Sequence, residues 1–152
     1  MLFQILFRRQ SPLVNRFVGS YQAGFTDGRS TTDQIFTVRQ ILQKCREYQV
    51  SIHHLFIDFK AAYDSIDWVQ LLQILHEYRF PSKLIKLIQA TMNGVRSSVR
   101  ISGVLSEPCE CRKGLKQGDE LSCLLFNIAL EGVIQRAGLN RRGTILILLG
   151  DQ

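Results

Sequence analysis

The hydrophobic residues of this chain change their spacing along the sequence, and this change restricts the fold more than any other feature. Between residues 31 and 48 they recur every three or four positions, as on one face of an α-helix. Between residues 95 and 101 apolar and polar residues alternate, which is the spacing of a β-strand. A chain that contains both periods is expected to fold as α+β, with an antiparallel sheet and helices packed behind it.

Polar cap residues indicate where the helices begin and end. Ser30 and Asp33 have the spacing of a capping box, Asp67 precedes a second apolar stripe, and Gly138 follows a third. Pro81 breaks one helix and starts the next. Helices are therefore expected over residues 31–48, 68–78, 82–92 and 120–137.

The strands are expected in three places. Residues 54–59 form a short apolar run that reads as a buried strand. Residues 95–112 read as a hairpin that bends at Gly103, and residues 143–149 as the first part of one more strand. That strand has no returning partner in the sequence, so the sheet is expected to be incomplete at its C-terminal end.

Charge and hydropathy narrow the classes of function. The formal net charge is +6 and the pI is near 9.4, which favours nucleic acid as a partner, with an anionic membrane surface second. No secretory signal is visible, since Arg8 and Arg9 follow the first apolar stretch, and the apolar run 145–149 is too short to cross a bilayer. We expect an intracellular protein, cytoplasmic or nuclear, with no membrane partner. Cys109 and Cys111 lack the paired spacing of a structural zinc site, so packed or exposed thiols are the favoured interpretation.

Asp58 is the first candidate for chemistry, because it stands inside the apolar run 54–59. A buried carboxylate costs several kcal/mol unless it is paired or binds a metal. It could bind a metal in a cleft, pair with Lys60 or a distant arginine, or lie at an exposed strand end. Asp64 and Asp67 more readily read as residues that cap the following helix.

Three stretches, in this order, resemble motifs of reverse transcriptases of the non-LTR retrotransposon type. They are QAGFTDGRST at residues 22–31, FIDFKAAYDSI at residues 56–66 and GLKQGDELSCLLF at residues 114–126. The resemblance covers roughly residues 21–143 and implies a palm-like sheet with part of the fingers. It divides the chain into a partial fingers or N-terminal segment, 1–20, and a single fingers and palm unit, 21–152.

The resemblance implies an RNA-directed DNA polymerase that adds deoxynucleotides by two-metal chemistry. Asp58 would be catalytic and would bind Mg²⁺ or Mn²⁺, which prefer oxygen ligands. The carbonyl of Phe59 would lie near the triphosphate, and Tyr63 would exclude a ribose 2′-hydroxyl by a steric clash. The partners implied are an RNA template, a DNA primer and deoxynucleoside triphosphates.

Further residues are implied to bind the nucleotide or the template. Gln117 and Gly118 would lie against the incoming nucleotide, and Arg29 would contact template phosphate or the triphosphate. Five basic residues over the hairpin and the loop after it could hold phosphates, although a solvated strand face is an equal alternative. They are Arg96, Arg100, Arg112, Lys113 and Lys116.

The sequence also departs from the family. In the family, an aromatic-Ala-Asp-Asp turn carries the remaining catalytic carboxylates. That turn is absent here, and only Asp151 stands near its expected place. Cys123 also replaces a proline that is common in the family. The catalytic set is therefore incomplete, and we expect the chain to be inactive alone. The alternatives are a decayed retroelement remnant that binds nucleic acid weakly and, if the three matches were accidental, a small α+β adaptor.

Overall fold

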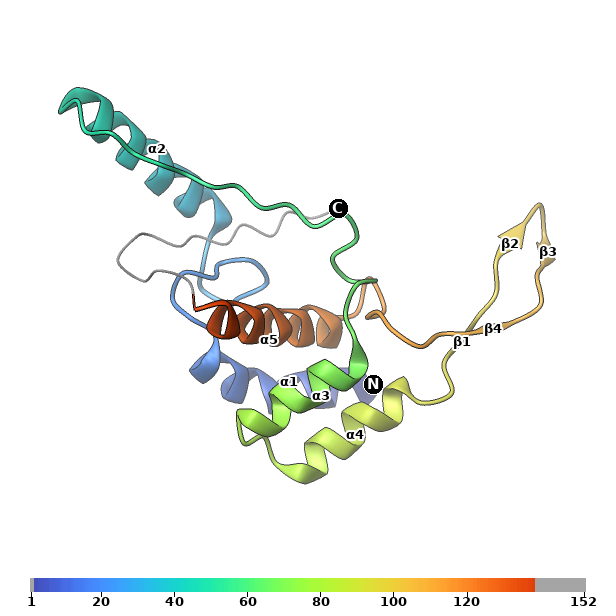
Figure 1. Cartoon of the computed structure of the whole chain (residues 1–152). Helices are drawn as coiled ribbons and strands as arrows, with labels where there is room; N and C mark the ends of the chain where they lie inside the picture. Colours follow the sequence, from blue (N-terminus) through green and yellow to red (C-terminus); the bar gives the residue numbers. More distant parts are fainter. Residues whose placement is uncertain (1, 139–152) are drawn as a thin grey trace.

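The structure is a computed structural model, and it describes residues 2–138 (Figure 1). This part of the chain forms five helices: α1 (Leu2–Phe17), α2 (Thr31–Glu47), α3 (Trp68–Glu77), α4 (Ser82–Met92) and α5 (Glu120–Ala137). Its four short strands are β1 (Arg96–Ser97), β2 (Arg100–Ile101), β3 (Val104–Leu105) and β4 (Cys109–Glu110). The expected α+β class is confirmed.

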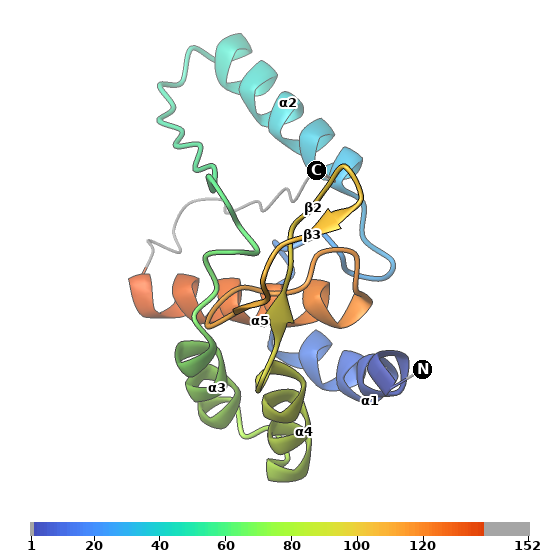
Figure 2. The same ribbon diagram turned by 90° about the vertical axis from the view of Figure 1, so that its right-hand side faces the viewer.

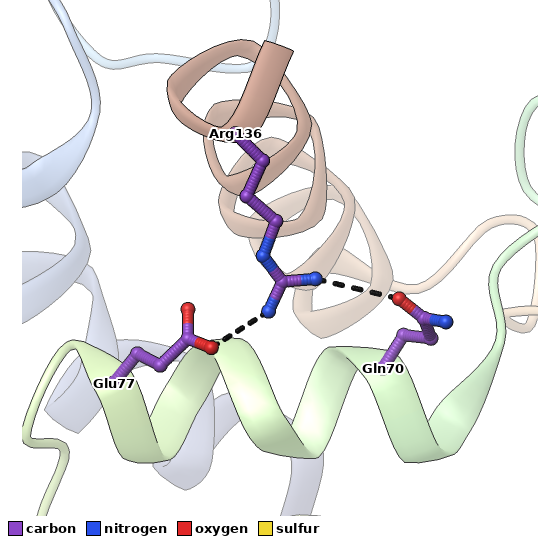
Figure 3. Close-up of polar contacts among 3 residues, drawn as sticks. All are labelled: Gln70, Glu77 and Arg136. Atoms are coloured by element: carbon purple, nitrogen blue, oxygen red, sulfur yellow. Dashed lines mark hydrogen bonds and ion pairs between the residues drawn. The ribbon is translucent and has the colours of Figure 1, made fainter. Parts of the chain in front are cut away.

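Helix α5 is the centre of the core. Helices α1, α3 and α4 lie on one side of it, whereas α2 projects away on the other side (Figures 1 and 2). All residues of α5 from Leu124 to Gly132 are buried, because the helix is apolar on nearly every face. Arg136 near its end donates to Gln70 Oε1 at 3.4 Å and to Glu77 Oε1 at 2.8 Å, and so joins α5 to α3 (Figure 3).

The helix boundaries follow the cap residues. Ser30 Oγ accepts a hydrogen bond from the Asp33 N–H at 3.3 Å, and Asp67 Oδ1 accepts one from the Gln70 N–H at 2.9 Å. Gly138 ends α5 in the left-handed conformation, with φ 59°. The four helices expected from the sequence are confirmed. In α4 the buried face is formed by Ile85, Ile88 and Met92.

The hairpin expected over residues 95–112 is also confirmed, and its main chain is paired from Val95 to Cys111. Strands β1 and β4 pair antiparallel with Arg96 opposite Glu110, and β2 and β3 pair with Ile101 opposite Val104. Ser102 and Gly103 both have positive φ, 49° and 86°, as a two-residue hairpin turn with the twist of the strands requires. The hairpin projects from the helices, and its strand residues are exposed to solvent (Figure 1).

Two features of the fold differ from the sequence-based expectation. Residues 54–59 form no strand, and Leu55, Phe56 and Ile57 are 82%, 75% and 70% exposed. A strand needs a hydrogen-bonding partner, and no other segment of residues 2–138 pairs with this one. The expected strand at 143–149 lies outside the described residues. Since no sheet within residues 2–138 exceeds two strands, the palm-like sheet stays a prediction.

Helix α1 is the second difference, because the sequence analysis did not predict it. Pro12 lies inside α1, and the helix has no acidic residue in its first turn, so the usual start signal is missing. Leu6, Gln10 and Val14 recur at four-residue spacing and are buried, on the side that packs against α5. Within the described residues, no helix combines the length and the apolar character needed to cross a bilayer.

The side chain of Tyr78 packs under α1, with its ring stacked on Phe17 at 5.0 Å between centroids. Its hydroxyl is buried and has no hydrogen-bond partner within residues 2–138. Burial raises the pKa of Tyr78 above its ordinary value, and the charges of Glu131 and Glu77 raise it further, while Arg136 lowers it. The folded state therefore favours the neutral phenol.

We expect Tyr78→Phe to raise the free energy of unfolding by about 1 kcal/mol at neutral pH, because it removes an unpaired buried hydroxyl. Because folding raises the pKa of Tyr78, ionising the phenol weakens the folded state. The unsubstituted chain should therefore keep its full stability below the unfolded pKa of about 10 and lose part of it as the pH rises beyond that value. Urea denaturation at neutral and alkaline pH measures both effects. Tyr48→Phe, at an exposed position, is the control. A loss of stability in Tyr78→Phe would refute the assignment.

Candidate nucleotide and nucleic-acid site

The segment after Asp58 and the loop that precedes α5 are joined by main-chain hydrogen bonds. The Leu115 N–H donates to the Tyr63 carbonyl at 3.0 Å, and the Gly114 N–H donates to the Ile66 carbonyl at 2.7 Å. The Trp68 Nε1–H donates to the Gly114 carbonyl at 2.6 Å. Two of the three motif stretches, 56–66 and 114–126, therefore lie side by side.

Tyr63 is held on α5 by both ends of its side chain. Its ring stacks on Phe126 with the centroids 5.1 Å apart and the planes 25° apart. Its hydroxyl donates to Cys123 Sγ at 3.3 Å. The Phe25 ring meets the Tyr63 ring edge-on with 6.5 Å between centroids, and the Phe59 ring meets the Phe126 ring edge-on with 6.4 Å between centroids. We call these four rings the aromatic cluster. Phe126 is buried, whereas Phe25 and Phe59 are 40% and 39% exposed, so the cluster faces solvent on one side.

The third motif stretch, residues 22–31, is also held on α5. Asn127 Nδ2 donates to the carbonyls of Gly24 and Phe25 at 3.0 and 3.3 Å. Glu131, only 1% exposed, accepts hydrogen bonds from the Gly19 N–H at 3.0 Å and from the Tyr21 hydroxyl at 2.7 Å. Because Phe25 contacts Tyr63, all three motif stretches meet along one helix.

Arg29 lies beside a hollow at the start of α2. Its Nη1 donates to the carbonyls of Gly19 and Gln22, at 2.6 and 2.7 Å, so its contacts fix the loop that carries it. The hollow has a volume of about 410 Å³ and is lined by residues 23–27 and 29–31. Whether Arg29 also reaches a phosphate stays a prediction.

The remaining predicted site residues are exposed. Asp58 lies on the extended segment one residue before the aromatic cluster. Gln117 and Gly118 lie at the tip of the loop before α5, where Gly118 has φ 85° and a Cβ would meet open space. The five basic residues predicted to hold phosphates are exposed on the hairpin and on this loop, namely Arg96, Arg100, Arg112, Lys113 and Lys116.

The described residues do not complete a metal site. Asp58 offers the oxygen ligand that Mg²⁺ and Mn²⁺ prefer. No group of three or more His, Cys, Asp or Glu side chains is gathered anywhere in residues 2–138, however. The donor type fits the metal, but the number of donors within residues 2–138 does not.

A family model described as "Reverse transcriptase (RNA-dependent DNA polymerase)" matches residues 4–145. The chain belongs to the reverse transcriptase family. The resemblance found in the three motif stretches is thereby confirmed, and the match begins within α1, before the first of them.

The curated relatives of this reverse transcriptase chain are proteins of retrotransposons. An uncharacterized 149 kDa protein of transposon TX1 from Xenopus laevis is 28% identical over 68% of the chain and 8% of its own length. The Pol polyprotein of the type-2 element R2DM from Drosophila melanogaster is 27% identical over 75% of the chain and 11% of its own length. A probable RNA-directed DNA polymerase from transposon BS of Drosophila melanogaster is 26% identical over 74% of the chain and 12% of its own length. The chain spans a small part of each, and no solved structure matches it.

Three residues that position the motif stretches on α5 were missed by the sequence analysis. Phe126 ends the motif at residues 114–126 but was assigned no role there, and Asn127 and Glu131 lie just beyond that motif. A signal was present, because Asn127 and Glu131 are the polar residues of the otherwise apolar run 124–134 and stand four positions apart.

Proposed function

We propose that this chain is the part of an RNA-directed DNA polymerase that contacts the incoming deoxynucleotide and the primer–template. The main-chain hydrogen bonds between residues 63–66 and residues 114–115 carry this proposal. They hold the segment that carries Asp58 and Tyr63 against the loop that carries Gln117. If these residues have their family roles, one bound nucleotide must contact both segments at the same time.

Tyr63 is proposed to select deoxyribose over ribose. The stacking on Phe126 and the hydrogen bond to Cys123 Sγ restrict both the plane and the tip of its ring. A fixed ring discriminates better than a mobile one, because it cannot move aside for a 2′-hydroxyl. The sulfur acceptor takes the place of the proline usual in the family and supports this role for Tyr63.

Gln117, Gly118, Phe59 and Arg29 are proposed to complete the nucleotide contacts. Gly118 lies in open space, so the main chain around it is accessible to a ligand. The Phe59 ring fixes its own main chain on Phe126, and Arg29 borders the hollow at residues 23–31. Arg96, Arg100, Lys113 and Lys116 are proposed to hold phosphates, since all four are exposed on the projecting hairpin and loop.

Asp58 is proposed to give one oxygen ligand to Mg²⁺ or Mn²⁺, with further carboxylates supplied from outside the described residues. The purified chain is therefore expected to show no primer extension above that of its Asp58→Ala variant. A larger polymerase in which residues 21–138 replace the corresponding segment is expected to extend a primer, and Asp58→Ala should reduce that rate at least about a thousandfold. Asp67→Ala, which removes a helix cap, is the matched carboxylate control.

Asp58-dependent incorporation by the chain alone would contradict the proposed incompleteness. Equal rates for the replaced polymerase with and without Asp58 would contradict the assigned role of this carboxylate.

A second candidate is a retroelement remnant that binds nucleic acid weakly and catalyses nothing. The exposed cations of the hairpin favour it, because phosphate binding by these residues does not require Asp58. The segment replacement distinguishes the two, since a remnant would give an inactive polymerase that still binds primer–template.

A further inference from the structure

Two cysteines lie on one face of the projecting hairpin. Cys109 belongs to β4, and the Cys111 N–H donates to the Val95 carbonyl at 2.9 Å, so the paired main chain continues through residue 111. Residues two apart in a strand point to the same side. The two thiols therefore share a face.

Both thiols also contact the same residue of the opposite strand. Cys109 Sγ donates to the Ser97 carbonyl at 3.3 Å, and Cys111 Sγ lies 3.1 Å from Ser97 Oγ. The sulfurs thus turn toward one place on β1. Cys109 is exposed and Cys111 is half-buried, so a solute can reach them.

We propose that Cys109 and Cys111 bind one soft monovalent cation of the Cu⁺ class through two thiolate sulfurs. Thiolates prefer such cations to the hard cations that carboxylates bind. Binding forms two sulfur–metal bonds and releases the two thiol protons, and no electron is transferred. Nothing in the polymerase proposal requires this site.

The spacing fits a bridging cation better than a disulfide. In a strand, Cα atoms two residues apart are separated by about 6.6 Å and their parallel Cβ atoms by a similar distance. A disulfide needs Cβ atoms about 3.8 Å apart, so it would bend the strand. If each sulfur–metal bond is about as long as a zinc–thiolate bond, about 2.3 Å, two such bonds in line span about 4.6 Å, which small side-chain rotations can meet.

The surroundings favour two ligands over four. Within residues 2–138 no third His, Cys, Asp or Glu side chain is grouped with the two thiols, as tetrahedral zinc would require. Two thiolates with one Cu⁺ carry a net charge of −1. By the same alternation Glu110, its register partner Arg96 and Arg112, which pairs with Glu110 at 3.8 Å, lie on the opposite face of the hairpin, so the Glu110 carboxylate points away from the ion.

The test is an anaerobic titration of the reduced full chain with Cu⁺ against a chromophoric chelator. We expect one ion per chain, a near-ultraviolet sulfur-to-copper band, and at least a tenfold loss of affinity in both Cys109→Ser and Cys111→Ser. Cys45→Ser and Cys123→Ser should retain the ion. Loss of the ion in these two controls, or its retention in Cys109→Ser, would overturn the proposal. Ready formation of a Cys109–Cys111 disulfide with glutathione disulfide would overturn its geometric basis.

Discussion

Glu131→Leu is expected to lower the free energy of unfolding by about 3 kcal/mol, because it removes the acceptor of several buried donors. The Glu131 carboxylate accepts from the Gly19 N–H, the Tyr21 hydroxyl and the Gln135 side chain, and it is 1% exposed. Leucine is apolar and of similar size, so the loss reports the polar contacts and not a cavity.

Chemical denaturation measures this effect, with Glu77→Leu as the matched control. Glu77 pairs with Arg136 at 2.8 Å, but its side chain is 56% exposed, so its replacement should cost less than about 1 kcal/mol. Glu131→Gln, which keeps an acceptor oxygen, should fall between the two. Equal losses for Glu131→Leu and Glu77→Leu would show that the buried carboxylate does not hold residues 19–21 on α5.

Gly114→Ala is expected to destabilise the chain by about 3 kcal/mol, of which about 1 comes from its positive φ and the rest from a clash. Gly114 has φ 90°, and a Cβ there would lie 3.2 Å from Asp64 Cα, which is tighter than an ordinary contact, whereas the Asp64 carbonyl oxygen at 3.5 Å would be in ordinary van der Waals contact. Asp64 Cα is a main-chain atom, so the main chain itself must shift by a few tenths of an ångström to admit the Cβ.

Gly118→Ala separates the clash from the conformational strain. Its φ of 85° is nearly the same, but no atom lies within 4 Å of the added Cβ, so only about 1 kcal/mol should be lost. Proteolysis in the region of residues 61–66 should also become faster in Gly114→Ala than in Gly118→Ala, because the two segments separate. If both variants lose the same stability, the close contact between these segments is not present in solution.

The features that could be predicted from the sequence depend on residues close together in the chain. Ser30 and Asp67 bond to main-chain groups three positions away, and Gly103 permits a turn within its own hairpin. Their physical causes are complete within a few residues, so a local pattern is enough to predict them.

The features that could not be predicted depend on distant partners. The run at residues 54–59 has strand-like composition, but pairing decides whether it forms a strand, and residues 2–138 offer it no partner. The motifs identified Tyr63 and Gln117, but not the stacking of Tyr63 on Phe126. The burial of Glu131 also depends on Gly19 and Tyr21, more than a hundred residues earlier.

The central claim is that this chain contacts the primer–template. The most direct test measures the binding of a labelled RNA–DNA primer–template by fluorescence anisotropy at two salt concentrations. With four phosphate contacts, raising salt from about 50 to about 200 mM should weaken binding about a hundredfold. Arg96→Gln with Arg100→Gln should lower the salt slope by about two, whereas Lys83→Gln with Lys86→Gln on α4 should leave it unchanged. Binding that is indifferent to salt, or equal in the two double variants, would contradict the assignment of the hairpin to primer–template.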